Sequence, residues 1–193
     1  DGLEGYRPET LDWAAGHPDE IITLPEQAIP AEGVFPYRYV TIDSPFDEDV
    51  WLTATEVRPG NTRVLHHVIV TAHKAGEAKR EKWITGYAPG TAAAPYPEDS
   101  AVHLPKGYQL RFQLHYTASG KPETDVTKLG LRVSREKVEK EFKTAIVMHR
   151  KFRIPAGDRE YAEEKTITLD KDAVLYGVNP HMHFRGKRMR FTA

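Results

Sequence analysis

From Tyr37 onward, short runs of β-branched and aromatic residues alternate with polar residues and are interrupted by turn residues. A strand with one buried face has this period of two, and Gly, Pro, Asn and Asp are typical of the turns between strands. Turn-type sequences recur, as in Arg58-Pro59-Gly60-Asn61 and Pro105-Lys106-Gly107. The pattern predicts strands over Tyr37–Ile42, Val50–Val57, Val64–Ala72, Lys82–Thr85, Tyr108–Tyr116, Lys128–Val133, Thr144–Val147, Lys165–Leu169, Val174–Val178 and His181–Phe191.

Many short strands at this spacing favour an all-β fold, and we expect jelly-roll-like β-sandwich domains. Residues 1–35 are rich in proline and acidic residues, which predicts an N-terminal arm or linker. The charged segment Ser134–Lys143 is the one candidate helix; it lacks an apolar stripe and is expected to link two β units. A turn at 155–157 follows shortly after. We therefore expect a first domain over residues 36–145 and the start of a second, incomplete domain over residues 146–193.

Composition limits the possible partners and ligands. The 193 residues carry 27 Lys and Arg against 28 Asp and Glu, a net charge of −1, whereas a nucleic-acid partner would need a basic face. No run approaches the roughly 18 apolar residues of a membrane span, and no signal peptide is visible at Asp1-Gly2-Leu3-Glu4. With 0 cysteines, metal ligands must come from His, Met or carboxylates. Both ends read as cut, so further domains are expected in the parent chain.

Five of the 9 histidines lie in hydrophobic, strand-like runs: His66, His67, His115, His181 and His183. Imidazole is a suitable ligand for Zn, Cu, Fe and Ni. Residues i and i+2 of a strand share one face, so His181 and His183 predict a two-ligand chelate. The alternative is a pair of half-exposed polar residues on an amphipathic strand.

The adjacent pair His66-His67 poses a geometric problem. Neighbours on a regular strand diverge, so both can bind one metal only if the strand bulges or ends there. Otherwise one ring is buried and the other faces solvent. His115 shares the polar face of its strand with Gln113, and it is either a ligand in a wet cleft or a solvated residue. Together the three imidazoles predict a site for copper or zinc. The other histidines are not expected to bind metal: His17, His73, His103 and His149.

In their order along the chain, these motifs resemble those of the copper type II, ascorbate-dependent monooxygenases. This is the family of dopamine β-monooxygenase and peptidylglycine α-hydroxylating monooxygenase. The segment from Trp83 through Tyr96-Pro97-Glu98 to His115-Tyr116 is also similar to that family. The resemblance covers about residues 37–193 and favours a bacterial-type, C-terminally truncated member. It rests on His66-His67, Leu114-His115-Tyr116 and His181-Met182-His183-Phe184-Arg185-Gly186-Lys187-Arg188.

The resemblance implies two copper ions, one in each of two jelly-roll-like domains. His66, His67 and His115 would bind the electron-transfer copper, and His181 and His183 the oxygen-activating copper. A Met thioether expected beyond residue 193 would complete the second site. Such an enzyme hydroxylates a C–H bond of a small-molecule or peptide substrate with O₂, takes its electrons from ascorbate, and lies outside the cytoplasm, in the periplasm or secreted.

Three alternatives remain open at the level of sequence. The first is a non-catalytic copper module on the same fold, used for storage, delivery or electron transfer. The second is a mononuclear zinc hydrolase built on His66, His67 and His115, which would need a nearby general base or acid. The third is a jelly-roll binding module without metal. The sequence contains no G-x-S-x-G motif, no phosphate-binding loop and no catalytic cysteine.

Overall fold

The computed structural model describes residues 13–77, 81–91, 93–149, 151–182 and 185–192. The chain divides into two compact units, unit 1 over Asp1–Thr144 and unit 2 over Ala145–Ala193. Strands are the only regular elements of the described residues, so the fold is all-β, as the sequence pattern predicts. None of the described residues forms a helix of the length and apolarity that a membrane span requires.

Unit 1 holds strands β1 to β11, arranged in three sheets. The five-stranded sheet has the order β1-β10-β4-β7-β11, the four-stranded sheet β3-β8-β5-β6, and β2 pairs with β9. All pairs are antiparallel except the short pair of β11 with β7. The bounds are β1 Glu20–Thr23, β2 Gln27–Ile29, β3 Arg38–Asp43, β4 Val50–Arg58, β5 Leu65–Lys74, β6 Lys82–Tyr87, β7 Ser100–Leu104, β8 Tyr108–Tyr116, β9 Glu123–Asp125, β10 Lys128–Ser134 and β11 Lys140–Glu141.

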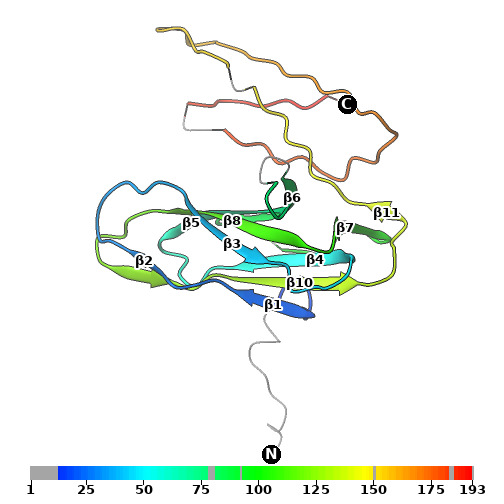
Figure 1. Ribbon diagram of the computed structural model, residues 1–193. Helices are drawn as coiled ribbons and strands as arrows, with labels where there is room; N and C mark the ends of the chain where they lie inside the picture. The colour runs from blue at the N-terminus through cyan, green and yellow to red at the C-terminus, as the bar shows by residue number, and fades with distance from the viewer. Residues whose placement is uncertain (1–12, 78–80, 92, 150, 183–184, 193) are drawn as a thin grey trace, which may run out of the picture. The chain divides into compact units, whose positions relative to one another are not determined.

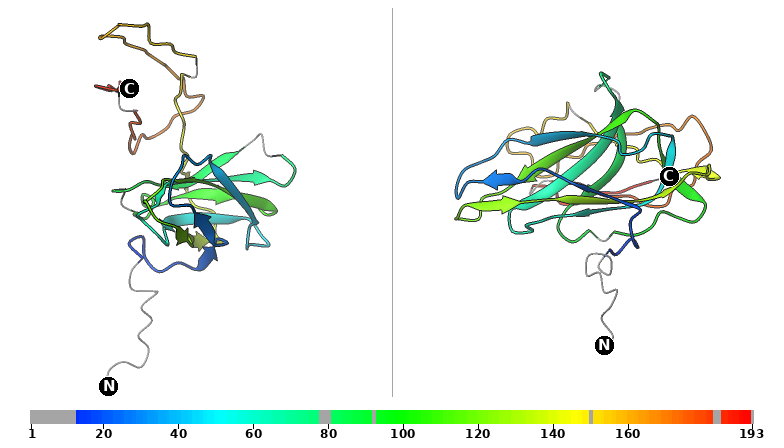
Figure 2. Two further views of the ribbon diagram at one scale, coloured as in Figure 1. Left: turned by 90° about the vertical axis from the view of Figure 1, so that its left-hand side faces the viewer. Right: turned by 60° about the horizontal axis from the view of Figure 1, so that its bottom comes forward.

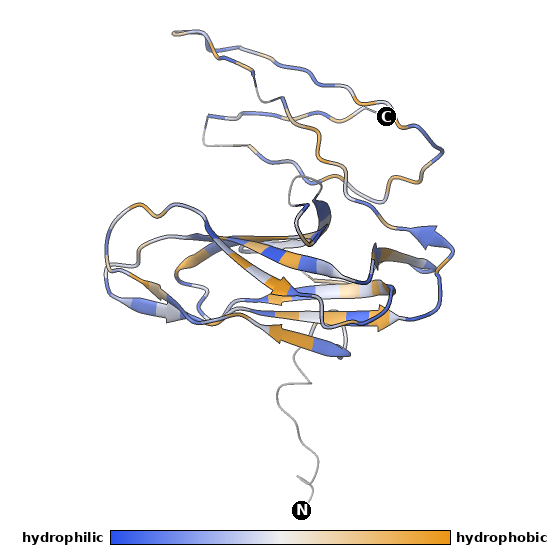
Figure 3. Ribbon diagram, viewed as in Figure 1, coloured by the Kyte–Doolittle hydropathy of each residue, from blue (hydrophilic) through white to orange (hydrophobic). Residues whose placement is uncertain are grey.

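The two larger sheets of unit 1 lie face to face as two layers, a β-sandwich-like arrangement (Figures 1 and 2). Hydrophobic and hydrophilic residues follow one another along their strands (Figure 3). In β8, Leu110, Phe112 and Leu114 are fully buried, whereas Gln113 and His115 between and beyond them are only half-buried. This alternation places the core between the layers and leaves the other face of the four-stranded sheet polar. Jelly-roll connectivity stays a prediction.

The prediction that residues 1–35 form an arm is wrong for the described part of that segment. β1 pairs with β10, and β2 pairs with β9. Ile22, Leu24 and Ile29 are buried in the common core. Trp13 is also buried, on the other face of β10, where Gly130 leaves room for its ring. Two very short strands within a proline-rich, acidic segment give too little alternation to be recognised.

The predicted helix over Ser134–Lys143 is also wrong. β10 runs to Ser134, and Lys140–Glu141 pairs in parallel with β7. Phe142, which follows, packs against the core and stacks on Tyr96 with 4.8 Å between ring centroids. The segment thus lies at the edge of the five-stranded sheet, and the packing of Phe142 stabilises its end.

In unit 2 the described residues contain no strand, so the strands predicted at 144–147, 165–169, 174–178 and 181–191 are wrong where the structure describes them. Their apolar side chains are largely exposed, as at Val174 (68 %). β-Propensity reflects packing on a pleated, half-buried surface, and a strand exists only as part of a ladder. An alternating sequence forms a strand only where a neighbouring strand is present to hydrogen-bond with it.

The docking of Trp13 on β10 yields a test of the corrected fold. A Cβ atom at position 130 would lie 2.6 Å from the Trp13 ring. We expect Gly130→Ala to lower the free energy of unfolding by about 1–3 kcal/mol, because the ring must be displaced. In a Trp13→Ala background the same substitution should cost much less. Urea unfolding of the four proteins measures this coupling; equal costs in both backgrounds would mean that Trp13 does not pack there.

Candidate metal centre

A β-bulge in β5 brings three histidines together at one end of the four-stranded sheet. Leu65 pairs with Tyr116 and His67 pairs with His115, so His66 is an extra residue between two consecutive pairs of the ladder. Leu65 and Val68 are both buried in the core (1 % exposed each), although two residues lie between them. A regular strand cannot bury both positions, since its period is two. The bulge resolves this conflict.

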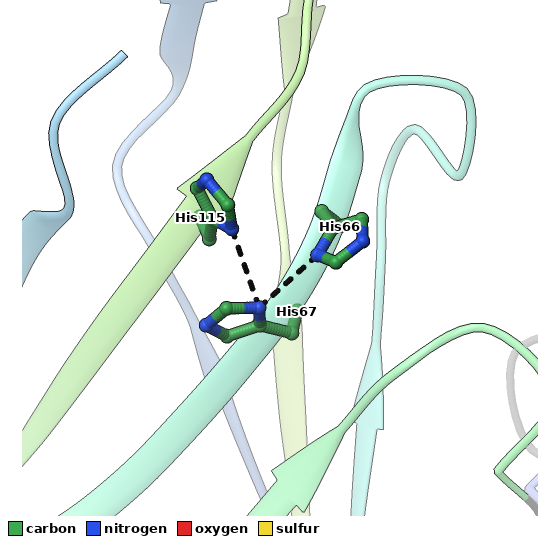
Figure 4. A group of neighbouring side chains, drawn as sticks. All are labelled: His66, His67 and His115. Carbon is green, nitrogen blue, oxygen red and sulfur yellow. Dashed lines mark hydrogen bonds between the residues drawn. The ribbon is translucent and has the colours of Figure 1, made fainter. Parts of the chain in front are cut away.

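Because of the bulge, His66 and His67 turn toward the same neighbour. Figure 4 shows the rings of His66 and His67, from β5, and of His115, from β8, gathered in one group, with His67 contacting each of the other two. His66 is exposed, and His67 and His115 are half-buried. The cluster therefore lies on the outer, solvent-accessible face of the sheet. One ligand atom of each of the three residues lies within 4.8 Å of the others.

The three rings approach one another through their Nδ1 atoms. The Nδ1 atom of His67 lies 3.2 Å from Nδ1 of His66 and 3.4 Å from Nδ1 of His115. An imidazole nitrogen has one in-plane position, which carries either a proton or a lone pair. Nδ1 of His67 can therefore make only one of these two contacts as a good hydrogen bond. A metal ion between the rings could instead accept the lone pairs of all three nitrogens.

The spacing of the nitrogens fits a metal ion. Imidazole nitrogens bind zinc at about 2.0–2.1 Å, so two such ligands in tetrahedral geometry lie roughly 3.3–3.4 Å apart. The two Nδ1–Nδ1 distances, 3.2 and 3.4 Å, match that spacing. The donor set is three imidazoles without a carboxyl group. Such a set fits Cu, Zn, Fe or Ni, and its geometry alone does not select among them.

The surroundings of His115 favour its neutral form. Burial lowers the pKa of His115 below its ordinary value, and the positive charge that His66 can carry lowers this pKa further. Metal ligation needs neutral imidazole, and protonation competes with it. A lowered pKa therefore leaves His115 available as a ligand over a wider range of pH.

Tyr37 borders the cluster on the side of β3. Its ring centroid lies 5.0 Å from that of His115, in an edge-on arrangement, and 5.7 Å from that of His67. Since Arg38 pairs with Leu114, Tyr37 continues the row that His115 and His67 form across the sheet. The sequence analysis missed this neighbour, because position 37 stood only as the first residue of a strand. No local pattern gives this contact, because it depends on the pairing of β3 with β8.

Tyr116 faces inward beneath the cluster. Its hydroxyl donates a hydrogen bond to Oδ2 of Asp125 (2.8 Å). Burial, and then this hydrogen bond, raise the pKa of Tyr116 far above its ordinary value, so it remains a donor. The sequence analysis noted Tyr116 only as part of a motif and did not single out Asp125.

The second predicted pair, His181 and His183, belongs to the part of the sequence that forms unit 2. His181 lies in unit 2 and is exposed, and His183 lies outside the described residues. Ligation by this pair stays a prediction. The other histidines lie elsewhere: His103 contacts Asp49, His17 contacts the Pro18 carbonyl, His149 pairs with Glu163, and His73 is buried at the end of β5.

Comparison with models of known protein families found no match, and comparison with curated proteins found none.

The pKa of His115 gives a direct test of the cluster in the metal-free protein. His66→Ala removes one of the two causes of the lowered pKa, so the pKa should rise, though not fully, because burial remains. His103→Ala, which alters a histidine paired with Asp49 instead, should leave it unchanged. NMR titration of the His115 ring measures the shift. An unchanged pKa in His66→Ala would mean that the two rings are not neighbours in solution.

The same shift fixes the sign of a pH effect on stability. A histidine whose folded pKa lies below the ordinary 6.5 takes up its proton more readily in the unfolded chain. Without metal, the contribution of His115 to stability is therefore complete above that ordinary value and declines as the pH falls below it.

Proposed function

We propose that unit 1 binds a single copper ion through the Nδ1 atoms of His66, His67 and His115. The observation that carries this proposal is the convergence of three Nδ1 atoms, with two of the three spacings at 3.2 and 3.4 Å. Copper is favoured over the other candidates by the order of the histidine motifs along the chain, which resembles that of the copper monooxygenases, and a set of imidazoles is a suitable site for it. When bound, copper would accept and donate one electron at a time by changing between Cu(II) and Cu(I).

The chain's own residues fit an electron-transfer role. The cluster lies at the outer face of a sheet, with His66 exposed, so a small reductant can reach it from solvent. The rigid ladder of β5 and β8 fixes the ligands, which limits rearrangement when the charge of the site changes. Ascorbate is the reductant that the resemblance implies.

The wider proposal is a copper-dependent monooxygenase that hydroxylates a C–H bond with O₂ and ascorbate. Its support is the order of the histidine motifs along the chain, together with the cluster in unit 1. In this proposal His181 and His183 hold a second copper ion, where O₂ and substrate meet. Unit 1 then stores one of the two electrons that hydroxylation consumes.

A second candidate function is a copper electron-transfer module without hydroxylase activity. The observation in its favour is that all three ligands of the first site come from unit 1, whereas the described residues around His181 form no strand. The zinc hydrolase alternative lacks such support, because the cluster includes no carboxyl group to act as general base.

Titration of the metal-stripped chain with Cu(I) in the presence of a chromophoric competitor tests the first site. Wild type should bind one tight equivalent, and His115→Ala should weaken that binding more than about 100-fold, beyond the usual cost of a second-shell change. His103→Ala is the matched control, since it removes a histidine of the same unit outside the cluster, and it should bind as wild type does. Equal affinity in His115→Ala would refute the site.

Stoichiometry separates the two candidate functions. The monooxygenase predicts a second, weaker copper equivalent that His181→Ala removes and His115→Ala retains. The electron-transfer module predicts one equivalent in wild type and no effect of His181→Ala, and it predicts the same in a longer chain that includes the Met expected beyond residue 193. Copper counted by equilibrium dialysis against metal-free buffer distinguishes the two results.

A further inference from the structure

A buried carboxyl group lies behind the histidine cluster. Asp125, the last residue of β9, is only 2 % exposed. Its Oδ1 accepts a hydrogen bond from the backbone N–H of Asn61 (2.7 Å). Its Oδ2 accepts from the hydroxyls of Tyr116 (2.8 Å) and Thr127 (2.7 Å). Buried polar groups of this kind are retained only when their hydrogen bonds are made, so the position is tightly specified.

Two of these donors belong to the segments that carry the histidines. Tyr116 directly follows His115 at the end of β8. Asn61 lies in the loop that enters β5, and its carbonyl accepts hydrogen bonds from the backbone N–H groups of Val64 (3.4 Å) and Leu65 (3.1 Å). Through these hydrogen bonds, the carboxyl group of Asp125 links the loop before β5 to the last residue of β8, next to the bulge.

This link opposes the loss of the bulge. If the regular ladder continued past the pair His67–His115, His66 would lie opposite Tyr116 and would point inward, and Leu65 would point outward. The observed register instead pairs Leu65 with Tyr116. Asp125 stabilises this pair from both sides, because it accepts hydrogen bonds from Asn61 in the loop before Leu65 and from Tyr116 itself. The position of His66 on the outer face therefore depends on contacts made on the inner face.

We propose that Asp125 is a positioning residue for the histidine cluster. By binding Asn61 and Tyr116, it holds the register of β5 and β8 that turns His66 and His67 toward His115. None of these hydrogen bonds involves a histidine ring. Asp125 therefore acts on the rings through the backbone segments that carry the histidines. The consequence for metal binding rests on the proposed function of the cluster, whereas the consequence for the register does not.

Three substitutions in the full chain separate positioning from general stability. Asp125→Asn keeps the size of the side chain but leaves one acceptor oxygen for three donors. Tyr116→Phe removes only the hydroxyl, and remains informative should Asp125→Asn fail to fold. Thr127→Val is the matched control, because it removes another hydrogen bond to the same oxygen from a residue outside the histidine-bearing strands. Urea unfolding shows how far each variant is destabilised.

With Cu(I) as the probe, Asp125→Asn and Tyr116→Phe should weaken binding about tenfold, as typical for outer residues that orient ligands. Thr127→Val should bind within about twofold of wild type, well below that outer-residue effect. Equal weakening in all three variants would reduce Asp125 to a contributor to stability. Unchanged affinity in both Asp125→Asn and Tyr116→Phe would overturn the inference.

A metal-free measurement keeps the inference independent of copper. The ring centroids of His66 and His67 lie 5.1 and 4.8 Å from that of His115, close enough for nuclear Overhauser contacts between ring protons. The His66–His115 contact should be present in wild type and Thr127→Val and absent in Asp125→Asn and Tyr116→Phe. If it persists in those two variants, Asp125 does not hold the register. If the contacts behave as expected but wild type binds no copper, only the proposed function fails.

Discussion

The extra residue of β5 at His66 is the constraint on which the candidate site depends. Without it, the alternation of the strand would send one of two adjacent histidines into the core and the other out to solvent. With it, Leu65 and Val68 both reach the core, and His66 and His67 both face His115. Packing on the inner face and ligand geometry on the outer face are therefore consequences of one local irregularity.

The surroundings of the bulge explain how His66 and His67, on an irregular segment, and His115, on the neighbouring strand, are held in place. Beneath it, Leu114 and Phe112 of β8 are fully buried between the two layers. Beyond it, the carboxyl group of Asp125 binds both chain segments. Beside it, Tyr37 packs edge-on against His115. A rigid base with specific hydrogen bonds is what a preorganised metal site needs, because small displacements of a ligand weaken binding.

Periodicity predicted the longer strands of unit 1, because each buries one face and repeats every two residues, as β8 does at Tyr108–Tyr116. It failed for β1 and β2, whose few residues show no period, and for unit 2, where the sequence alternates but the described residues form no strand. The sequence pointed to His66, His67 and His115 as candidates, and the adjacent pair predicted that the strand either bulges or ends there if both bind one metal. The register that creates the bulge, and the contact to Asp125, depend on residues far apart in sequence, which no local pattern contains.

The central claim is that one copper ion is held by three Nδ1 atoms. Nitrogen-15 NMR of histidine side chains in the Cu(I)-loaded protein tests it most directly, since Cu(I) is diamagnetic and the two ring nitrogens have separate signals. The account predicts that the Nδ1 signals of His66, His67 and His115 shift on loading while their Nε2 atoms keep their protons. Shifts confined to fewer than three of these residues, or located at Nε2, would contradict it.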